Sequence, residues 1–189
     1  FKLIERVARE CRSPLSYGGG IKSLDQIERI ISSGIEKVII SKAFFESKGE
    51  ICAKIAKLFG SQSLVVCFDV RQGKLWKNKY STYTIRGTYK EKMSIIEGVK
   101  IAEENGVGEI IINSIDRDGL RLGYDYLLAK VISETTKIPI IMSGGAISFE
   151  DAKNLMNTFP GVAAAGSSIF TLKGKFNAVL MQYPSEIDR

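Results

Sequence analysis

Residues 19–25 (GGIKSLD) recur 125 residues later as residues 144–150 (GGAISFE), and the same offset places residues 42–45 (KAFF) on residues 167–170 (SSIF). A repeat that keeps its register through a turn, a helix and the next strand indicates a duplicated unit. Each copy holds two strand–helix units of a block about four units long, so we predict an α/β fold, a (β/α)8 barrel built from two half-barrels. A doubly wound open sheet is the alternative, but it does not explain the repeat.

Short apolar runs alternate with helical periodicity along the chain. Strands are expected at residues 14–17, 37–41, 64–69, 109–114, 139–143 and 162–165, and helices at 23–33, 48–59, 92–105, 124–135 and 148–157. Ser23 and Ser148 stand where helix N-caps belong. Strands that are apolar on both faces, each followed by a helix, indicate a parallel sheet covered by helices.

Two further expectations concern the domain as a whole. Residues 74–87 alternate aromatic residues and threonine, which predicts a small hairpin inserted after the strand that ends at Asp69. Subtracting the offset of 125 from Asp69 gives a position ahead of Phe1. We therefore expect residues 1–189 to be a single partial barrel domain, strands 3 to 8, with two strand–helix units belonging in front of it and an intact length of about 250 residues.

Composition excludes several classes of protein. The chain has 189 residues, no histidine, three cysteines and a net charge of +6. Without histidine there is no Ser-His-Asp or Cys-His catalysis and no His-ligated metal, and we predict neither a metal nor a cofactor. The cysteines lack C-x-x-C spacing, which predicts free thiols in a reducing cytoplasm. Basic residues alternate with acids and no apolar run spans a bilayer, so neither nucleic acid nor membrane is expected as a partner.

Glycine motifs follow two strands that the repeat relates. One strand is followed by Gly18, Gly19 and Gly20, and its counterpart ends at Ser143 and is followed by Gly144 and Gly145. The next strand ends at Ser41 and Lys42 in the first copy and at Ser167 and Ser168 in the second. Barrel enzymes bind substrates at these strand ends, where glycine lets backbone N–H groups approach an anion. Two matching sites predict a bisphosphate substrate. The alternative is that the glycines only close tight turns.

Carboxylates are the plausible proton-transfer groups. Asp69 ends an apolar strand, where partial shielding from water can adapt a carboxylate to general acid or base catalysis. The structural alternative is that Asp69 pairs with Arg71 or caps the next turn. Asp116 and Asp118 end another strand, although Asp118 with Gly119 also fits a simple turn. The repeat predicts a second acid in the other half-barrel.

Six short motifs resemble the cyclase subunit of imidazole glycerol phosphate synthase, the HisF family. They are residues 17–21 (YGGGI), 60–62 (GSQ), 68–71 (FDVR), 108–110 (GEI), 114–125 (SIDRDG followed by GYD) and 143–146 (SGGA). The resemblance runs from Phe1 to about Phe170. It implies that ammonia from a glutaminase partner, bound as a heterodimer, passes through the barrel. Ammonia then converts a ribulosyl aminoimidazole carboxamide nucleotide into imidazole glycerol phosphate and aminoimidazole carboxamide ribotide, a step of histidine biosynthesis.

The resemblance also implies residue roles. Asp69 would be one of two catalytic aspartates; Gly20 would bind one phosphate, and the other end of the substrate would be held by Asp118, Gly119, Gly144, Gly145 and Ser168. Lys37 and Glu109 would gate ammonia at the bottom of the barrel, and Glu36 and Gln62 would face the partner. From the residues alone, these last four are ordinary solvated charges and polar groups at strand starts.

Two departures from the family pattern leave alternatives open. Ser41 and Lys42 stand where the family usually has an Asn-Thr pair, and residues 174–185 differ from the usual charged C-terminal helix. That ending resembles the HisF-like paralogues of surface-polysaccharide gene clusters, which are thought to supply ammonia for amidation of a sugar. A non-catalytic ammonia-channel scaffold is a second alternative, and an isomerase of the related histidine-pathway barrel is a third.

Overall fold

The computed structural model describes residues 2–73, 79–173 and 178–181. Its main sheet holds six parallel strands in the order β1-β2-β3-β6-β7-β8, with β4 and β5 added antiparallel beyond β3. The bounds are β1 Ser16–Gly18, β2 Lys37–Ile40, β3 Leu64–Gln72, β4 Tyr80–Thr84, β5 Tyr89–Lys90, β6 Glu109–Ser114, β7 Ile140–Ser143 and β8 Val162–Ala164. The predicted parallel α/β sheet is confirmed, and all six parallel strands begin within two residues of the predicted starts.

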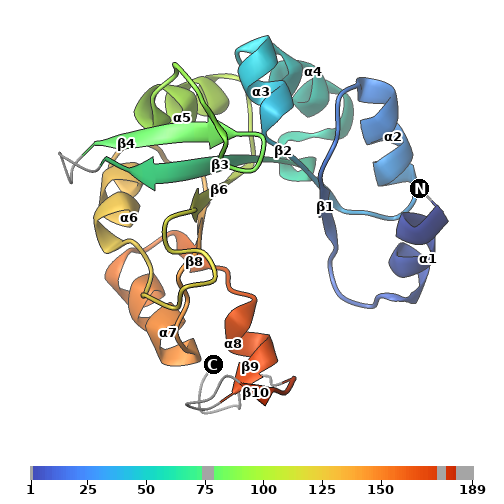
Figure 1. Ribbon diagram of the computed structural model, residues 1–189. Coiled ribbons are helices and arrows are strands. Elements are labelled where there is room, and N and C mark those ends of the chain that lie inside the picture. The colour runs from blue at the N-terminus through green and yellow to red at the C-terminus, as the bar shows by residue number, and fades with distance from the viewer. Residues whose placement is uncertain (1, 74–78, 174–177, 182–189) are drawn as a thin grey trace.

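Helices follow the parallel strands and form an outer arc around the curved sheet (Figure 1). They are α1 Lys2–Glu10, α2 Leu24–Ser32, α3 Lys42–Ser47, α4 Glu50–Phe59, α5 Ile95–Glu104, α6 Tyr126–Ser133, α7 Phe149–Thr158 and α8 Ser168–Thr171, with a 3₁₀ turn, η1, at Ser61–Ser63. A doubly wound sheet would carry helices on both faces. Helices on the outer side alone favour a barrel wall.

Side chains alternate between the two faces of each strand, as the period of two requires. On β3, Val66, Phe68 and Val70 are fully buried, whereas Cys67 and Asp69 are half-buried on the inner face. Phe68 makes edge-to-face contacts with two α3 rings, at centroid distances of 5.2 Å to Phe44 and 5.8 Å to Phe45. This aromatic cluster fixes α3 against the outside of β3 and leaves the inner face free for polar groups.

The sequence repeat is also a repeat of hydrogen bonds. Ser23 caps α2 by accepting the N–H of Gln26 at 3.4 Å, and the Gln26 side chain accepts the N–H of Lys22 at 2.8 Å. Ser148 caps α7 by accepting the N–H of Asp151 at 3.1 Å. Asp151 in turn accepts the N–H of the residue before that cap, Ile147, at 3.2 Å. Both predicted N-caps are confirmed, and each fixes where its helix begins after the glycine turn.

The hairpin beyond Asp69 is built on a longer strand than the sequence predicts. β3 continues to Gln72, and its last four residues pair antiparallel with β4, Asp69 opposite Tyr83 and Gln72 opposite Tyr80. β4 then pairs with β5. Residues 74–78 of the predicted insertion lie outside the described residues. The extension carries the hairpin past the carboxyl end of the sheet, where the predicted site lies.

Several elements and one expectation fall outside the predicted alternation. The short helices α3 and α8 follow strands directly, and a two-stranded pair, β9 Leu172–Lys173 with β10 Ala178–Val179, comes after α8; most of residues 174–185 lie outside the described residues. Within the described chain, β1 and β8 each pair with a single parallel strand. Closure of the barrel by two further strand–helix units stays a prediction.

Truncating Phe68 to alanine tests the aromatic cluster. Phe68→Ala should lower the free energy of unfolding by roughly 3–5 kcal/mol, because the variant loses buried ring contacts and leaves a cavity between β3 and α3. Urea unfolding followed by circular dichroism measures the change. Leu58→Ala is the control, since Leu58 on α4 is 61% exposed and its loss should cost less than about 0.5 kcal/mol. Equal effects of the two substitutions would contradict the packing described here.

Candidate functional site

Two cavities open at the carboxyl ends of the parallel strands. The first, of about 1010 Å³, lies over β1, β2 and β3, and the second, of about 590 Å³, lies over β7 and β8. The first brings together four predicted site residues, Gly20, Ser41, Lys42 and Asp69. The second brings together the five residues that the resemblance assigns to the other end of the substrate, Asp118, Gly119, Gly144, Gly145 and Ser168, and also Ser143 and Ser167 of the predicted phosphate motifs.

Nine residues that line the first cavity match nine that line the second at the offset of 125. Gly18 and Ile21 in the first cavity match Ser143 and Ala146 in the second, and the remaining pairs include Ser41 with Gly166, Lys42 with Ser167, Ala43 with Ser168 and Glu46 with Thr171. The cavities are therefore two copies of one structural unit on opposite arms of the sheet. A ligand with similar groups at its two ends fits such a pair.

The glycines of the two cavities are required for different structural reasons. A Cβ at Gly144 would lie 2.5 Å from the Ser114 carbonyl oxygen, and one at Gly145 would lie 2.3 Å from that of Gly123. Close backbone packing thus demands both. Gly20 has φ +68 and nothing within 4 Å of its Cβ position. It needs glycine for its conformation alone and leaves open space for a ligand above it.

The cavities also differ in charge. Lys42 and Glu46 form an ion pair at 2.9 Å across one turn of α3, with both side chains more than half exposed. In the second cavity the matching positions are neutral, and the Thr171 hydroxyl donates to the Ser167 carbonyl at 3.2 Å. The first cavity therefore holds a carboxylate, Glu46, at a position where an anion is predicted to bind, and Lys42 balances it.

Asp69 lies on the inner face at the end of β3 and accepts a hydrogen bond from Asn113 Nδ2 at 2.9 Å. Register places Asp69 beside Asn113 and Asn113 beside Ser143, so the three residues form a polar row across β3, β6 and β7. Sequence reasoning missed Asn113. The sequence does show that Asn113 stands near the end of a predicted strand. It does not show that this strand pairs with β3, which is what brings Asn113 beside Asp69.

The alternative in which Asp69 pairs with Arg71 is wrong. Arg71 lies two residues after Asp69 on the same face of β3, but its Nε lies 2.9 Å from Asp116 Oδ1. Its guanidinium also stacks 4.9 Å from the centre of the Tyr83 ring. Asp116 accepts the N–H of Gln72 as well, at 2.9 Å. Asp116 thus fastens the hairpin to the loop after β6, and Asp69 keeps its carboxylate for the cavity.

The loop after β6 has its own scaffold. Arg117 donates to the carbonyl of Gly123 at 3.2 Å and lies 3.8 Å from the buried carboxylate of Asp125. Asp125 also caps α6 and accepts the Tyr80 hydroxyl at 3.1 Å. Burial and the neighbouring Asp125 raise the pKa of Tyr80. These bonds hold Asp118 at the second cavity.

The four residues predicted for the ammonia gate and the partner surface lie at the opposite ends of the strands. Lys37 and Glu109 begin β2 and β6, and their side chains meet in a half-buried ion pair of 2.9 Å that reaches across β3. Glu36 and Gln62 are exposed at the same end, just before β2 and β3. The structure therefore separates this group from the two cavities by the length of the sheet.

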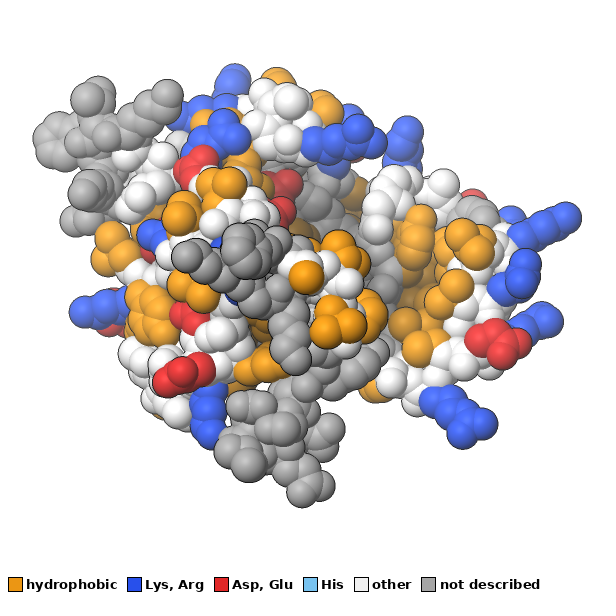
Figure 2. Space-filling view, turned by 60° about the horizontal axis from the view of Figure 1, so that its bottom comes forward, with side chains coloured by type: hydrophobic (Ala, Val, Ile, Leu, Met, Phe, Trp, Pro, Cys, Tyr) orange, Lys and Arg blue, Asp and Glu red, His pale blue; other side chains and the backbone are white. Residues whose placement is uncertain are grey.

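The distribution of charged and apolar side chains on the surface is consistent with a small-molecule site. On the face in Figure 2, Lys and Arg side chains are spread around the rim, while apolar side chains gather in the central hollow. Among the described residues, no group of three or more Cys, Asp and Glu side chains could hold a metal ion. None of the helices described is long and apolar enough to cross a membrane.

Comparison with known proteins identifies the family. The model of the histidine biosynthesis protein family matches residues 1–176, so the chain belongs to that family. A protein of Vibrio vulnificus (strain YJ016) with the provisional name imidazole glycerol phosphate synthase subunit hisF3 is 43% identical over the whole chain and 72% of its own length. A Leptospira borgpetersenii protein, provisionally named as subunit HisF, is 43% identical over the whole chain and 74% of its own length. The imidazole glycerol phosphate synthase subunit HisF of Sulfolobus acidocaldarius is 40% identical over 81% of the chain and 60% of its length. These relatives confirm the resemblance to the HisF family.

Cys67 lines the first cavity, two residues before Asp69, and should be chemically inert there. Burial, with a smaller contribution from the Asp69 carboxylate, raises the pKa of Cys67 from 9.0 to about 12. At pH 8 the thiolate fraction is then about a thousandfold below that of an ordinary thiol, and the thiolate is the reactive form. Iodoacetamide should therefore modify Cys11 at least a hundredfold faster than Cys67, as measured by mass spectrometry of peptides. Asp69→Asn should speed modification of Cys67 by lowering its pKa, and comparable wild-type rates at the two cysteines would contradict this account.

Proposed function

We propose that this chain is a cyclase subunit of the imidazole glycerol phosphate synthase type, which uses ammonia to close an imidazole ring on a bisphosphorylated substrate. One observation carries the proposal: two cavities with matching positions lie at the carboxyl ends of the strands, and the inner-face carboxylate of Asp69 lines the first of them. A substrate with a phosphate at each end would place its reacting centre between the two cavities. The HisF-named relatives support this activity.

Asp69 would act as the general acid or base. Asn113 holds Oδ1 at 2.9 Å, and no protein partner of Oδ2 is found in the described part of the chain. A carboxylate with one oxygen oriented and the other free can transfer a proton to or from a bound substrate. The repeat predicts a second acid in the other half-barrel, and it would belong to the strands expected in front of β1.

Ammonia would enter from the opposite end. The Lys37–Glu109 ion pair lies at the start of the inner face, so opening it would admit ammonia along the row of small and apolar side chains, Val65, Cys67 and Ile111, that leads to Asp69. A glutaminase subunit would dock at this end, where Glu36 and Gln62 are exposed.

A second function keeps the fold and the ammonia but changes the acceptor. The Lys42–Glu46 pair at the first cavity supports assignment to the paralogues that supply ammonia for amidation of a surface-polysaccharide sugar, because the matching positions of the second cavity, Ser167 and Thr171, are neutral. The relatives that match the whole chain carry provisional or numbered names, whereas the Sulfolobus HisF matches 81% of it. Rescue of a cyclase-deficient histidine auxotroph by the full-length gene distinguishes the two functions.

Replacing Asp69 tests the cyclase function. Asp69→Asn should lower turnover with free ammonium and the ribulosyl nucleotide by about 10²–10⁴-fold, since it removes proton transfer while an amide still fits beside Asn113. Steady-state formation of imidazole glycerol phosphate measures the loss. Asp116→Asn is the matched control, because Asp116 fastens the hairpin outside the cavity, and it should retain turnover within about tenfold. Turnover of Asp69→Asn within a few-fold of wild type would return Asp69 to a structural role.

Exchanging the charged pair tests the asymmetry of the cavities. The double variant Lys42→Ser with Glu46→Thr gives the first cavity the residues of the second at these two positions and should bind inorganic phosphate several-fold more tightly in equilibrium dialysis, because the Glu46 carboxylate then no longer opposes the anion. Lys42→Ser alone should bind phosphate more weakly than wild type, since Glu46 is left without its cation. The reverse exchange, Ser167→Lys with Thr171→Glu, is the control and should weaken the second site. Tighter binding by Lys42→Ser alone would contradict the role given to Glu46.

A further inference from the structure

The turn between β4 and β5 holds two consecutive residues in a conformation that side chains disfavour. Ile85 has φ 52 and Arg86 has φ 57, in the left-handed region. A Cβ crowds the following carbonyl there, and the β-branched Ile85 is disfavoured still more than other residues. Such strain persists only where surrounding contacts impose it, and it gathers at functional sites.

The contacts that impose it come from both strands of the hairpin. Thr82 and Thr84 are buried, and the Thr84 hydroxyl donates to Glu91 Oε1 at 2.6 Å. The Thr82 hydroxyl donates to the carbonyl of Met93. At the tip, Thr88 closes the turn by donating its N–H at 3.2 Å and its hydroxyl at 2.6 Å to the Ile85 carbonyl. The hairpin therefore presents its tip in one fixed direction.

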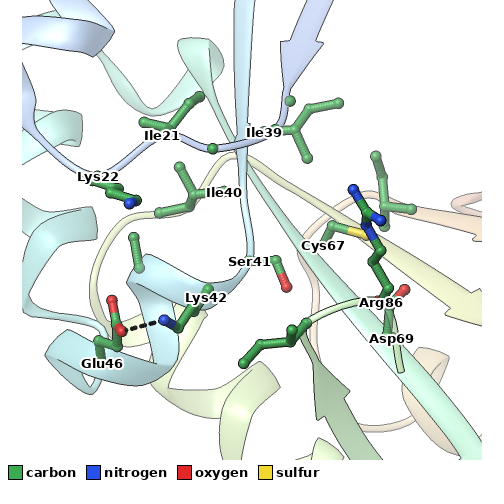
Figure 3. Close-up of a pocket in the computed structure, with 16 residues that line it drawn as sticks. Ile21, Lys22, Ile39, Ile40, Ser41, Lys42, Glu46, Cys67, Asp69 and Arg86 are labelled. Carbon is green, nitrogen blue, oxygen red and sulfur yellow. Dashed lines mark ion pairs between the residues drawn. The ribbon is translucent and has the colours of Figure 1, made fainter. Parts of the chain in front are cut away.

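That direction is toward the first cavity. Ile85 and Arg86 both line it, and Figure 3 shows the Arg86 side chain pointing toward the strand end that carries Cys67 and Asp69. Arg86 is exposed and forms no ion pair or hydrogen bond within the described chain. Lys42, by contrast, is occupied by Glu46. Arg86 is thus a guanidinium with all its donors available, held over the cavity by a strained turn.

The second cavity is also lined by an arginine with a left-handed backbone conformation. Arg121, from the loop after β6, has φ 53 and lines that cavity. Its Nη2 donates to the carbonyl of Ile147 at 2.9 Å, so this arginine is tethered to the rim. Four non-glycine residues in the described chain have positive φ, and two of them are arginines that line the two cavities. In each cavity, therefore, a residue with left-handed backbone conformation is an arginine whose side chain lines the cavity.

We infer that Arg86 is an anion-binding residue of the first cavity, which contributes the forked guanidinium contact to a phosphate group seated above Gly20 and Ser41. A planar guanidinium can donate two parallel hydrogen bonds to a phosphate, which the Lys42 ammonium cannot. Arg86 would thereby offset the carboxylate of Glu46. The identity of the phosphate ester rests on the proposed function; the binding of phosphate itself does not.

Equilibrium dialysis of the full chain against inorganic phosphate tests the inference, because it reports the number of sites as well as their affinity. Arg86→Gln should weaken one of the two sites about tenfold or more, as loss of a charge-assisted contact predicts. Arg6→Gln removes the same charge from the exposed face of α1 and should change either site less than twofold. An unchanged affinity in Arg86→Gln, or an equal loss in Arg6→Gln, would overturn the assignment.

Arg86→Gly separates binding from folding. Glycine adopts φ 57 without strain, so this variant should unfold at the same temperature as wild type or higher, while losing phosphate affinity as Arg86→Gln does. A lower unfolding temperature with intact binding would mean that Arg86 serves the hairpin rather than the ligand. Turnover does not enter these measurements. If the phosphate result holds and no cyclase activity is found, the proposed function alone fails; if activity is found and phosphate binding is unchanged, this inference alone fails.

Discussion

The alternation of side chains along β3 is the constraint on which the rest of the structure depends. A strand sends successive residues to opposite faces, so Phe68, locked between Phe44 and Phe45 on the outside, obliges Cys67 and Asp69 to face inward. A shift of one residue would bury a carboxylate under a helix and expose an aromatic ring. The energy of the aromatic cluster therefore also fixes the position of the candidate catalytic group.

Parallel pairing extends that constraint across the sheet. Because neighbouring parallel strands keep one register, Asp69, Asn113 and Ser143 lie at the same level, and Lys37 and Glu109 lie together at the other end. Polar groups thus occupy both ends of the inner face, with apolar side chains such as Ile111 between them.

Duplication and divergence are both visible in the two cavities. The capping bonds of Ser23 and Ser148 are copies, and they hold each glycine turn at the same place relative to the helix that follows. What changed between the copies is the charge near the ligand position, where Lys42 and Glu46 replace Ser167 and Thr171. The hairpin and its Arg86 belong to the first cavity, so the copy with the added carboxylate is also the copy whose arginine has no ion pair or hydrogen bond within the described residues.

By itself the sequence determined the parallel α/β sheet, the places where its parallel strands begin and the grouping of glycine and serine motifs into two matched sets. These follow from local periodicity, from capping residues and from a repeat that can be counted. Tertiary structure alone decided that Asn113 orients Asp69, that Arg71 turns to Asp116 instead, and that Arg86 reaches the first cavity. Each of these contacts joins residues on different strands, or a hairpin and a strand end. The distance between them depends on strand pairing and on the path of β3 beyond the sheet, which no local pattern of residues specifies.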